Sequence, residues 1–137
     1  MFLISHRGNI SGPVPDSENK PEYITDALRL GFDVEIDVWF RDGWFLGHDE
    51  PQYRIEPEFL LNKSLWCHAK NVCAFKRLID MGTVCFWHQH DDYALTTNNF
   101  IWTFPGKILT TMSICVMPEL FCKNLEDLSF CAGICSD

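Results

Sequence analysis

Ionisable side chains stand at or near the ends of the first three apolar runs of the chain. His6 and Arg7 follow the first run, Glu35 and Asp37 lie in the second, and His48 follows the third. Acids two residues apart on a strand point to the same side, because side chains alternate between the two faces. Glu35 and Asp37 can therefore face one divalent cation, and Mg²⁺ or Ca²⁺ are the ions that suit carboxylate oxygens best.

Two carboxylates, two imidazoles and an arginine are the parts needed for metal-assisted cleavage of a phosphate ester. Imidazole titrates near neutral pH, so His6 and His48 are candidates for a proton donor and acceptor. Two ionised carboxylates in a buried strand repel each other and lose hydration, so Glu35 and Asp37 need a compensating cation. A metal ion or Arg7 supplies it, unless the pair lies at a strand end that faces water.

Later apolar runs also end in polar side chains. His68 and Lys70 stand two residues apart after the fourth run and share a face. Lys70 is suited either to holding a phosphate oxygen or to an ion pair with Glu35. His88 and His90 follow the fifth run, where a polar loop is favoured over a second metal site and His88 is expected to reach the pocket. Three further residues are candidates for the wall or rim of the pocket: Trp102, Glu119 and Asp137.

Length and composition restrict the class of protein. With 137 residues, 47% of them hydrophobic, the chain is expected to form one domain over residues 1–137. Its net charge of −8 argues against a nucleic-acid partner, since phosphate backbones are bound by basic surfaces. No secretory signal or transmembrane segment is expected, because the apolar runs are short. The seven cysteines are an odd number and favour reduced thiols and a cytoplasmic location.

Short apolar runs alternate with helical patterns. Residues 21–30 and 71–81 show helical spacing and end at a glycine, a third helix is expected over 119–128, and a single turn over 57–61. Strand, helix, strand at this rhythm predicts a parallel sheet with right-handed crossovers. Asp42-Gly43 is a hairpin signal that folds the third run back beside the second. Eight strands are expected, at 2–5, 33–39, 44–47, 65–69, 84–87, 100–103, 113–117 and 132–135.

The order and spacing of these motifs resemble the glycerophosphodiester phosphodiesterases, within the phosphatidylinositol-phospholipase-C-like phosphodiesterases. The likeness is specific over roughly the first 50 residues and thinner beyond them. It is carried by Ser5-His6-Arg7-Gly8, Glu18-Asn19, the segment from Gly31 to Val38, Asp42-Gly43 and Gly47-His48-Asp49, and then by His68-Ala69-Lys70, Ile101-Trp102-Thr103 and the closing strand from Gly133 to Asp137.

The resemblance implies an α/β fold, a compact, reduced TIM-type (β/α) barrel with shortened or missing helices, since a full barrel takes about 250 residues. A thin helical layer exposes apolar strand faces, which makes a homo-oligomer one outcome. The implied activity is hydrolysis of a glycerophosphodiester or a similar small polyol or lipid-headgroup phosphodiester. A lyase that releases a cyclic phosphate, or an inactive barrel that binds a phosphorylated ligand, are the alternatives.

The resemblance also implies residue roles. Glu35 and Asp37 are then metal ligands, Arg7 contacts the phosphate, and His6 and His48 act as acid and base. Lys70, His88 and Trp102 complete the substrate-binding set. The family's third carboxylate ligand corresponds to His68, which removes one negative charge. Three consequences are open: weaker metal binding, a shift towards Mn²⁺ or Zn²⁺, or Glu119 as the third ligand instead.

Overall fold

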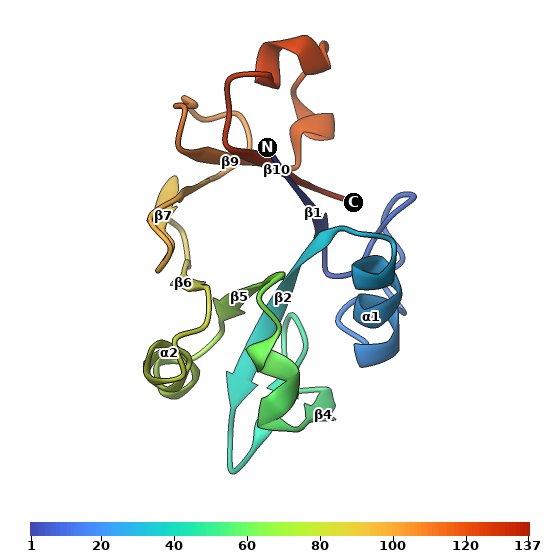
Figure 1. The fold of residues 1–137 in the computed structure, drawn as a ribbon, viewed down its shortest axis with the longest axis vertical. Helices are drawn as coiled ribbons and strands as arrows, with labels where there is room; N and C mark the ends of the chain where they lie inside the picture. Colours follow the sequence, from blue (N-terminus) through green and yellow to red (C-terminus); the bar gives the residue numbers. More distant parts are fainter.

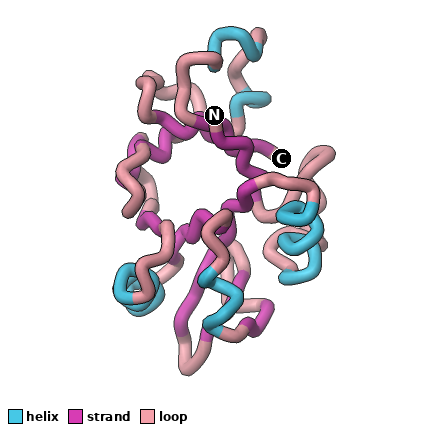
Figure 2. Tube along the Cα trace, viewed as in Figure 1, coloured by secondary structure: helices cyan, strands magenta, loops and turns pink.

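The computed structural model describes residues 1–137, with the side chain of Leu125 left out. Ten strands form one mixed sheet that curls until its strands follow one another around a ring (Figures 1 and 2). The strands are β1 (Phe2–His6), β2 (Asp33–Phe40), β3 (Trp44–Leu46), β4 (Tyr53–Ile55), β5 (Leu65–Ala69), β6 (Cys85–Trp87), β7 (Tyr93–Leu95), β8 (Ile101–Thr103), β9 (Ser113–Val116) and β10 (Gly133–Ser136).

Most neighbouring strands are parallel. The parallel path runs β8-β9-β10-β1-β2-β5-β6, and β7 adds to β8 in the antiparallel direction. β3 and β4 continue from the end of β2 as an antiparallel meander. Strands buried on both faces read as continuous apolar runs, which is why the parallel arrangement could be predicted. The three-residue strands β4 and β7 were not predicted.

Local turn and helix signals behave as expected. Asp42 and Gly43 have φ angles of 51° and 144°, and they join β2 to β3 as the predicted hairpin. The first two predicted helices are confirmed as α1 (Pro21–Arg29) and α2 (Val72–Asp80), and the predicted turn is the 3₁₀ helix Pro57–Leu61. Asn71 caps α2, because its side chain accepts a hydrogen bond from the Ala74 amide at 2.8 Å.

The expected TIM-type barrel is wrong. The part of the chain described here holds two α-helices of nine residues each on a mixed sheet, so helices do not alternate with strands. The reason is the length of the connections: only residues 88–92 separate β6 from β7, whereas a helical crossover needs about a dozen residues. The helix expected over 119–128 is also wrong, since the segment forms two 3₁₀ turns, Pro118–Leu120 and Leu125–Leu128.

The two faces of the sheet differ in what they bury. The outer face packs against α1 and α2 through an apolar cluster that includes Ile36, Val38 and Leu65. The inner face carries a second apolar cluster, built around Trp66, Phe86 and Trp102. Four parallel strands continue this inner face with an ionisable residue two positions after a buried one: Ile4 and His6, Trp66 and His68, Phe86 and His88, and Cys135 and Asp137. Strand alternation thus collects the ionisable groups at the carboxyl ends of the strands.

Candidate functional site

A cavity of about 590 Å³ lies at these strand ends. Eight of the nine site residues predicted from the sequence line it, and the ninth, Asp37, is buried beside Glu35. The cavity has a charged side and an apolar side. The charged side carries His6, Arg7, Glu35, His48, His68 and Lys70, and the apolar side carries Trp87, Trp102, Phe104, Val116, Met117 and Leu120.

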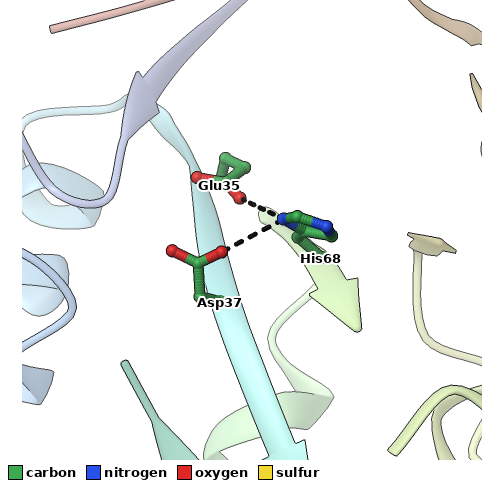
Figure 3. Close-up of side chains that lie close together, drawn as sticks. All are labelled: Glu35, Asp37 and His68. Carbon is green, nitrogen blue, oxygen red and sulfur yellow. Dashed lines mark ion pairs between the residues drawn. The ribbon is translucent and has the colours of Figure 1, made fainter. Parts of the chain in front are cut away.

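Glu35, Asp37 and His68 form the closest group of possible metal ligands (Figure 3). The register of β2 with β5 sets Asp37 directly beside His68. The Nδ1 atom of His68 lies 3.1 Å from Oδ1 of Asp37 and 3.9 Å from Oε1 of Glu35. One ligand atom from each residue lies within 4.8 Å of the others. The three side chains could therefore hold a single cation.

Asp37 is surrounded by cations. Its Oδ2 atom lies 3.0 Å from Nε of Arg7 and accepts a hydrogen bond from the Asn19 side chain at 2.9 Å. Its Oδ1 atom faces His68 and, at 3.4 Å, Nζ of Lys70. Burial alone would raise the pKa of Asp37, but the close contact with His68 and the charges of His68, Arg7 and Lys70 hold it far below its usual range. Asp37 is thus an ionised carboxylate.

The carboxylate of Glu35 has far fewer hydrogen-bond donors and positive charges around it than that of Asp37. It is 3% exposed, its Oε2 atom has no hydrogen-bond partner, and Nε2 of His6 lies 3.9 Å from that atom. Burial and the charge of Asp37 raise the pKa of Glu35 above its usual value, and His6, Arg7 and His68 offset this only in part. A buried carboxylate oxygen without a partner is costly. A proton or a cation would remove that cost.

The ring of His68 is held in one orientation. It stacks on Phe86 with centroids 5.1 Å apart and an interplanar angle of 6°. Its Nε2 atom lies 3.0 Å from the backbone oxygen of His88. A carbonyl oxygen only accepts hydrogen bonds, so Nε2 carries the hydrogen and Nδ1 faces the carboxylates. Burial lowers the pKa of His68, but Asp37 and Glu35 outweigh this effect and raise it overall.

Each of the two candidate acid–base histidines is paired with an aspartate. Nδ1 of His6 lies 2.7 Å from Oδ1 of Asp137, and Nδ1 of His48 lies 2.8 Å from Oδ1 of Asp49. Because ionised carboxylates only accept hydrogen bonds, these contacts leave Nε2 of each ring to exchange a proton. Burial lowers the pKa of His48, and Arg7 adds to this effect while Asp49 opposes it. The first pair joins residues from the two ends of the chain, and the second joins adjacent residues.

The sequence did not reveal the full roles of two residues, Asp137 and Asn19. Asp137 was expected only in the pocket wall, yet it holds His6 and also accepts a hydrogen bond from Asn9 at 2.9 Å. Asn19 was noted only as part of a motif, yet it is buried and bonds Asp37 twice: its amide donates to the carboxylate, and its oxygen accepts from the Asp37 backbone amide. The period-two position of Asp137 after Cys135 was the available signal for the first.

Arg7 connects the two carboxylates nearest to it. It has a φ of 55°, and its guanidinium lies 3.0 Å from Glu18 through Nη1 and 3.0 Å from Asp37 through Nε. Burial lowers the pKa of Arg7, but Asp37, Glu35 and Glu18 raise it overall. Arginine has five N–H donors, so donors are left to meet an anion in the cavity.

The remaining candidates lie around the rim. Lys70 and His88 line the cavity, and burial together with the charge of His68 lowers the pKa of His88. His90 is exposed on the same loop. Glu119, the alternative third ligand, is exposed and accepts a hydrogen bond from Ser136 at 2.8 Å. The geometry therefore brings His68, and not Glu119, to the two carboxylates.

The chain was compared with family models, curated proteins and solved structures, and none of them matches it. The resemblance to glycerophosphodiester phosphodiesterases therefore rests on the sequence motifs, and membership of that family stays a prediction. Within the described residues, none of the helices has the length and apolar character required to cross a membrane.

Proposed function

We propose that this chain is a metal-dependent phosphodiesterase that hydrolyses a glycerophosphodiester or a similar small polyol or lipid-headgroup phosphodiester. Two histidine–aspartate pairs and a buried carboxylate pair beside one cavity are what supports this most directly. This combination supplies a proton donor, a proton acceptor and a cation site around one substrate-sized space.

The residues fit one divalent cation. Oε2 of Glu35 and Oδ1 of Asp37 are buried and lack hydrogen-bond partners, and Nδ1 of His68 points at the same place. Two carboxylates and one imidazole are a common ligand set for such ions. The sequence predicts Mg²⁺ or Ca²⁺ for this site, with a shift towards Mn²⁺ or Zn²⁺ where His68 is the third ligand. A bound cation would stabilise the charge that develops on the non-bridging phosphate oxygens.

The chain's own residues perform the remaining steps. Arg7 and Lys70 bind the phosphate, since both carry donors at the charged side of the cavity. One of His6 and His48 accepts the proton of the attacking hydroxyl, and the other protonates the leaving alcohol. Asp137 and Asp49 hold the two rings in the tautomer that this needs. The apolar side, with Trp102 and with His88 at its edge, would take one of the two alcohols.

A second candidate is a module that binds a phosphorylated ligand without turnover. The observation that favours it is the neutralisation of Asp37 by Arg7, His68 and Lys70, which provides an internal substitute for a metal ion. In that case the same cations would meet the phosphate of the ligand. A lyase uses the same groups: a substrate hydroxyl attacks phosphorus and the other alcohol leaves, but the cyclic phosphate is released instead of being opened by water.

The first experiment measures hydrolysis of bis(p-nitrophenyl) phosphate and of glycerophosphodiesters with Mg²⁺, Ca²⁺, Mn²⁺ or a chelator. We expect metal-dependent turnover that falls by roughly 10²–10⁴-fold in His6→Ala, the usual contribution of a general acid or base. Glu58→Ala is the control, because Glu58 is exposed on the 3₁₀ helix Pro57–Leu61 and does not line the cavity. A folded protein without turnover under any metal would favour the binding module. Phosphorus NMR of the product separates an open monoester from a cyclic ester.

We also propose a cytoplasmic location. All seven cysteines are free, and five of them are buried. Burial raises the pKa of Cys67 and Cys135 and so keeps these thiols protonated. Such thiols suit a reducing compartment.

A further inference from the structure

The candidate metal site formed by Glu35, Asp37 and His68 combines one nitrogen ligand with carboxylate oxygens. Nδ1 of His68 lies 3.1 Å from Oδ1 of Asp37 and 3.9 Å from Oε1 of Glu35 (Figure 3). Two donors that bind one ion at about 2.1 Å are roughly 3.0–3.4 Å apart at angles from a right angle to a tetrahedral one. The His68–Asp37 separation of 3.1 Å already falls in that interval, and the His68–Glu35 separation of 3.9 Å lies about 0.5 Å beyond its upper end.

The imidazole is prepared for coordination. Its Nε2–H donates to the backbone oxygen of His88 at 3.0 Å, so the opposite nitrogen faces the carboxylates. Metal-ligating histidines nearly always donate their other N–H in this way to a carbonyl, a carboxylate or water. Stacking on Phe86, which itself stacks on Trp102 with centroids 4.5 Å apart, restrains the ring.

Some oxygens of the two carboxylates are held by protein groups, and others are left to bind a ligand. Oδ2 of Asp37 is held by Arg7 and Asn19, and Oδ1 is left towards His68 without a hydrogen bond. Oε2 of Glu35 is also without one. Lys70 lies 3.4 Å from Oδ1, at the end of a flexible side chain that reaches the cavity. An ion can therefore replace the lysine ammonium at Oδ1 without disturbing the buried anchors of Asp37.

We propose that Glu35, Asp37 and His68 bind a divalent transition ion of the Mn²⁺, Co²⁺ and Zn²⁺ class in preference to Mg²⁺ and Ca²⁺. Imidazole suits these ions, whereas Mg²⁺ and Ca²⁺ favour sites made of oxygen. This inference rests on the proposed function, because it names the cation of the same site, and it decides between the two expectations, Mg²⁺ or Ca²⁺ on one side and Mn²⁺ or Zn²⁺ on the other.

Calorimetric titration of the chelator-stripped chain tests the preference without any phosphodiester present. We expect Co²⁺ and Zn²⁺ to bind at one site about 100-fold more tightly than Mg²⁺. His68→Glu makes the group all-oxygen, and the ratio of Co²⁺ to Mg²⁺ affinity should fall by about tenfold or more. His90→Ala should leave the ratio unchanged, because it removes an exposed imidazole outside the group.

Proton NMR of the Co²⁺-loaded wild type tests the ligand itself and needs no variant. Coordination through Nδ1 leaves Nε2–H bonded to the His88 carbonyl, so one strongly shifted imidazole N–H resonance should appear in H₂O and vanish in D₂O. His68→Gln should lack it. This measurement decides the matter even if His68→Glu does not fold.

Two results would overturn the proposal: Co²⁺ and Zn²⁺ binding no tighter than Mg²⁺, or a Co²⁺ complex without the shifted N–H resonance. Turnover provides a separate readout. Tight Co²⁺ binding without hydrolysis of any diester would leave the metal preference standing and remove the proposed phosphodiesterase. Hydrolysis with Mg²⁺ in a chain that does not bind Co²⁺ would do the reverse.

Discussion

The strands β1, β2 and β5 differ from β8 and β9 in what they bury on the inner face of the same sheet. In the first group β2 places Glu35 and Asp37 there and β5 places His68, whereas β8 and β9 place Trp102 and Ile114. The helices α1 and α2 follow β1 and β5, whereas β8 and β9 are followed by loops and 3₁₀ turns. On the inner face, buried charged side chains therefore lie on strands that have helical cover, whereas the strands without that cover bury apolar side chains.

This difference between the two groups of strands shows how a small domain keeps carboxylates buried. Asp37 has partners from three segments: Arg7 after β1, Asn19 in the following loop, and His68 and Lys70 at the end of β5. Each partner is fixed in turn, as when Arg7 is held by Glu18. On the other side, buried polar groups are neutral hydroxyls that need only one or two neighbours. A buried charge needs several hydrogen-bond and ion-pair partners, and those partners have to be held in place by ordered segments.

Asp37→Asn should give the largest effect on stability. It leaves Arg7, His68 and Lys70 facing a neutral amide, and breaking a buried ion pair costs about 3–5 kcal/mol. Urea unfolding followed by circular dichroism measures the loss. Thr103→Val is the control on β8, where loss of a hydroxyl bonded to Ser113 at 3.1 Å should cost only about 1 kcal/mol. Equal losses would remove the energetic basis of the comparison.

Phe86→Leu tests whether the two sides are coupled. Phe86 lies between Trp102 and His68 in a stack of rings, so its loss should free the imidazole. We expect Co²⁺ affinity to fall by about tenfold, as for other residues that support metal ligands. Phe75→Leu is the control, since Phe75 packs against Trp87 from α2 on the outer face. Similar losses of affinity in both variants would indicate a general weakening of the fold.

Phe104→Ala should affect only the apolar side. Phe104 lines the cavity and is 46% exposed, so the free energy of unfolding should hardly change. The KM for bis(p-nitrophenyl) phosphate should rise by roughly tenfold with little change in kcat, because a lost apolar contact weakens binding by about 1–3 kcal/mol. Ile108→Ala, on the same loop and 81% exposed, is the control. A KM that rises equally for a glycerophosphodiester would mean that the wall does not distinguish the two alcohols.

Much of the local structure could be predicted from the sequence. Continuous apolar runs identified eight of the ten strands, and the proline and glycine positions identified α1 and α2. The overall fold could not be predicted, because the resemblance supplied an architecture for which the later connections are too short. Residues 88–92 cannot form a crossover helix, and Asn124 begins a new 3₁₀ turn where a longer helix was expected.

The sequence predicted which residues form the candidate site better than it predicted which of them pair with one another. Period-two alternation brought Glu35 beside Asp37 and placed His68 on the same inner face. Which carboxylate each cation meets depends on register and rotamer: the ion pair considered for Lys70 was with Glu35, and Lys70 instead lies at Asp37. The Asp137–His6 pair joins residues 131 positions apart, and that contact depends on the parallel pairing of β10 with β1.

Glu35→Gln should give the smallest effect, and its sign is informative. Burial and Asp37 raise the pKa of Glu35 in the folded chain, so the stability linked to its proton is full below the unfolded pKa of about 4.3 and declines as pH rises through the folded pKa. Glutamine does not titrate. In chelator, the variant should therefore gain in urea midpoint relative to wild type between pH 4 and pH 7, while the exposed Glu58→Gln should not. Added Co²⁺ should reverse the order, because the ion needs the carboxylate. A variant that loses stability at pH 7 in chelator would show that His6 and Arg7 already compensate this charge, and that the charged side needs no ion.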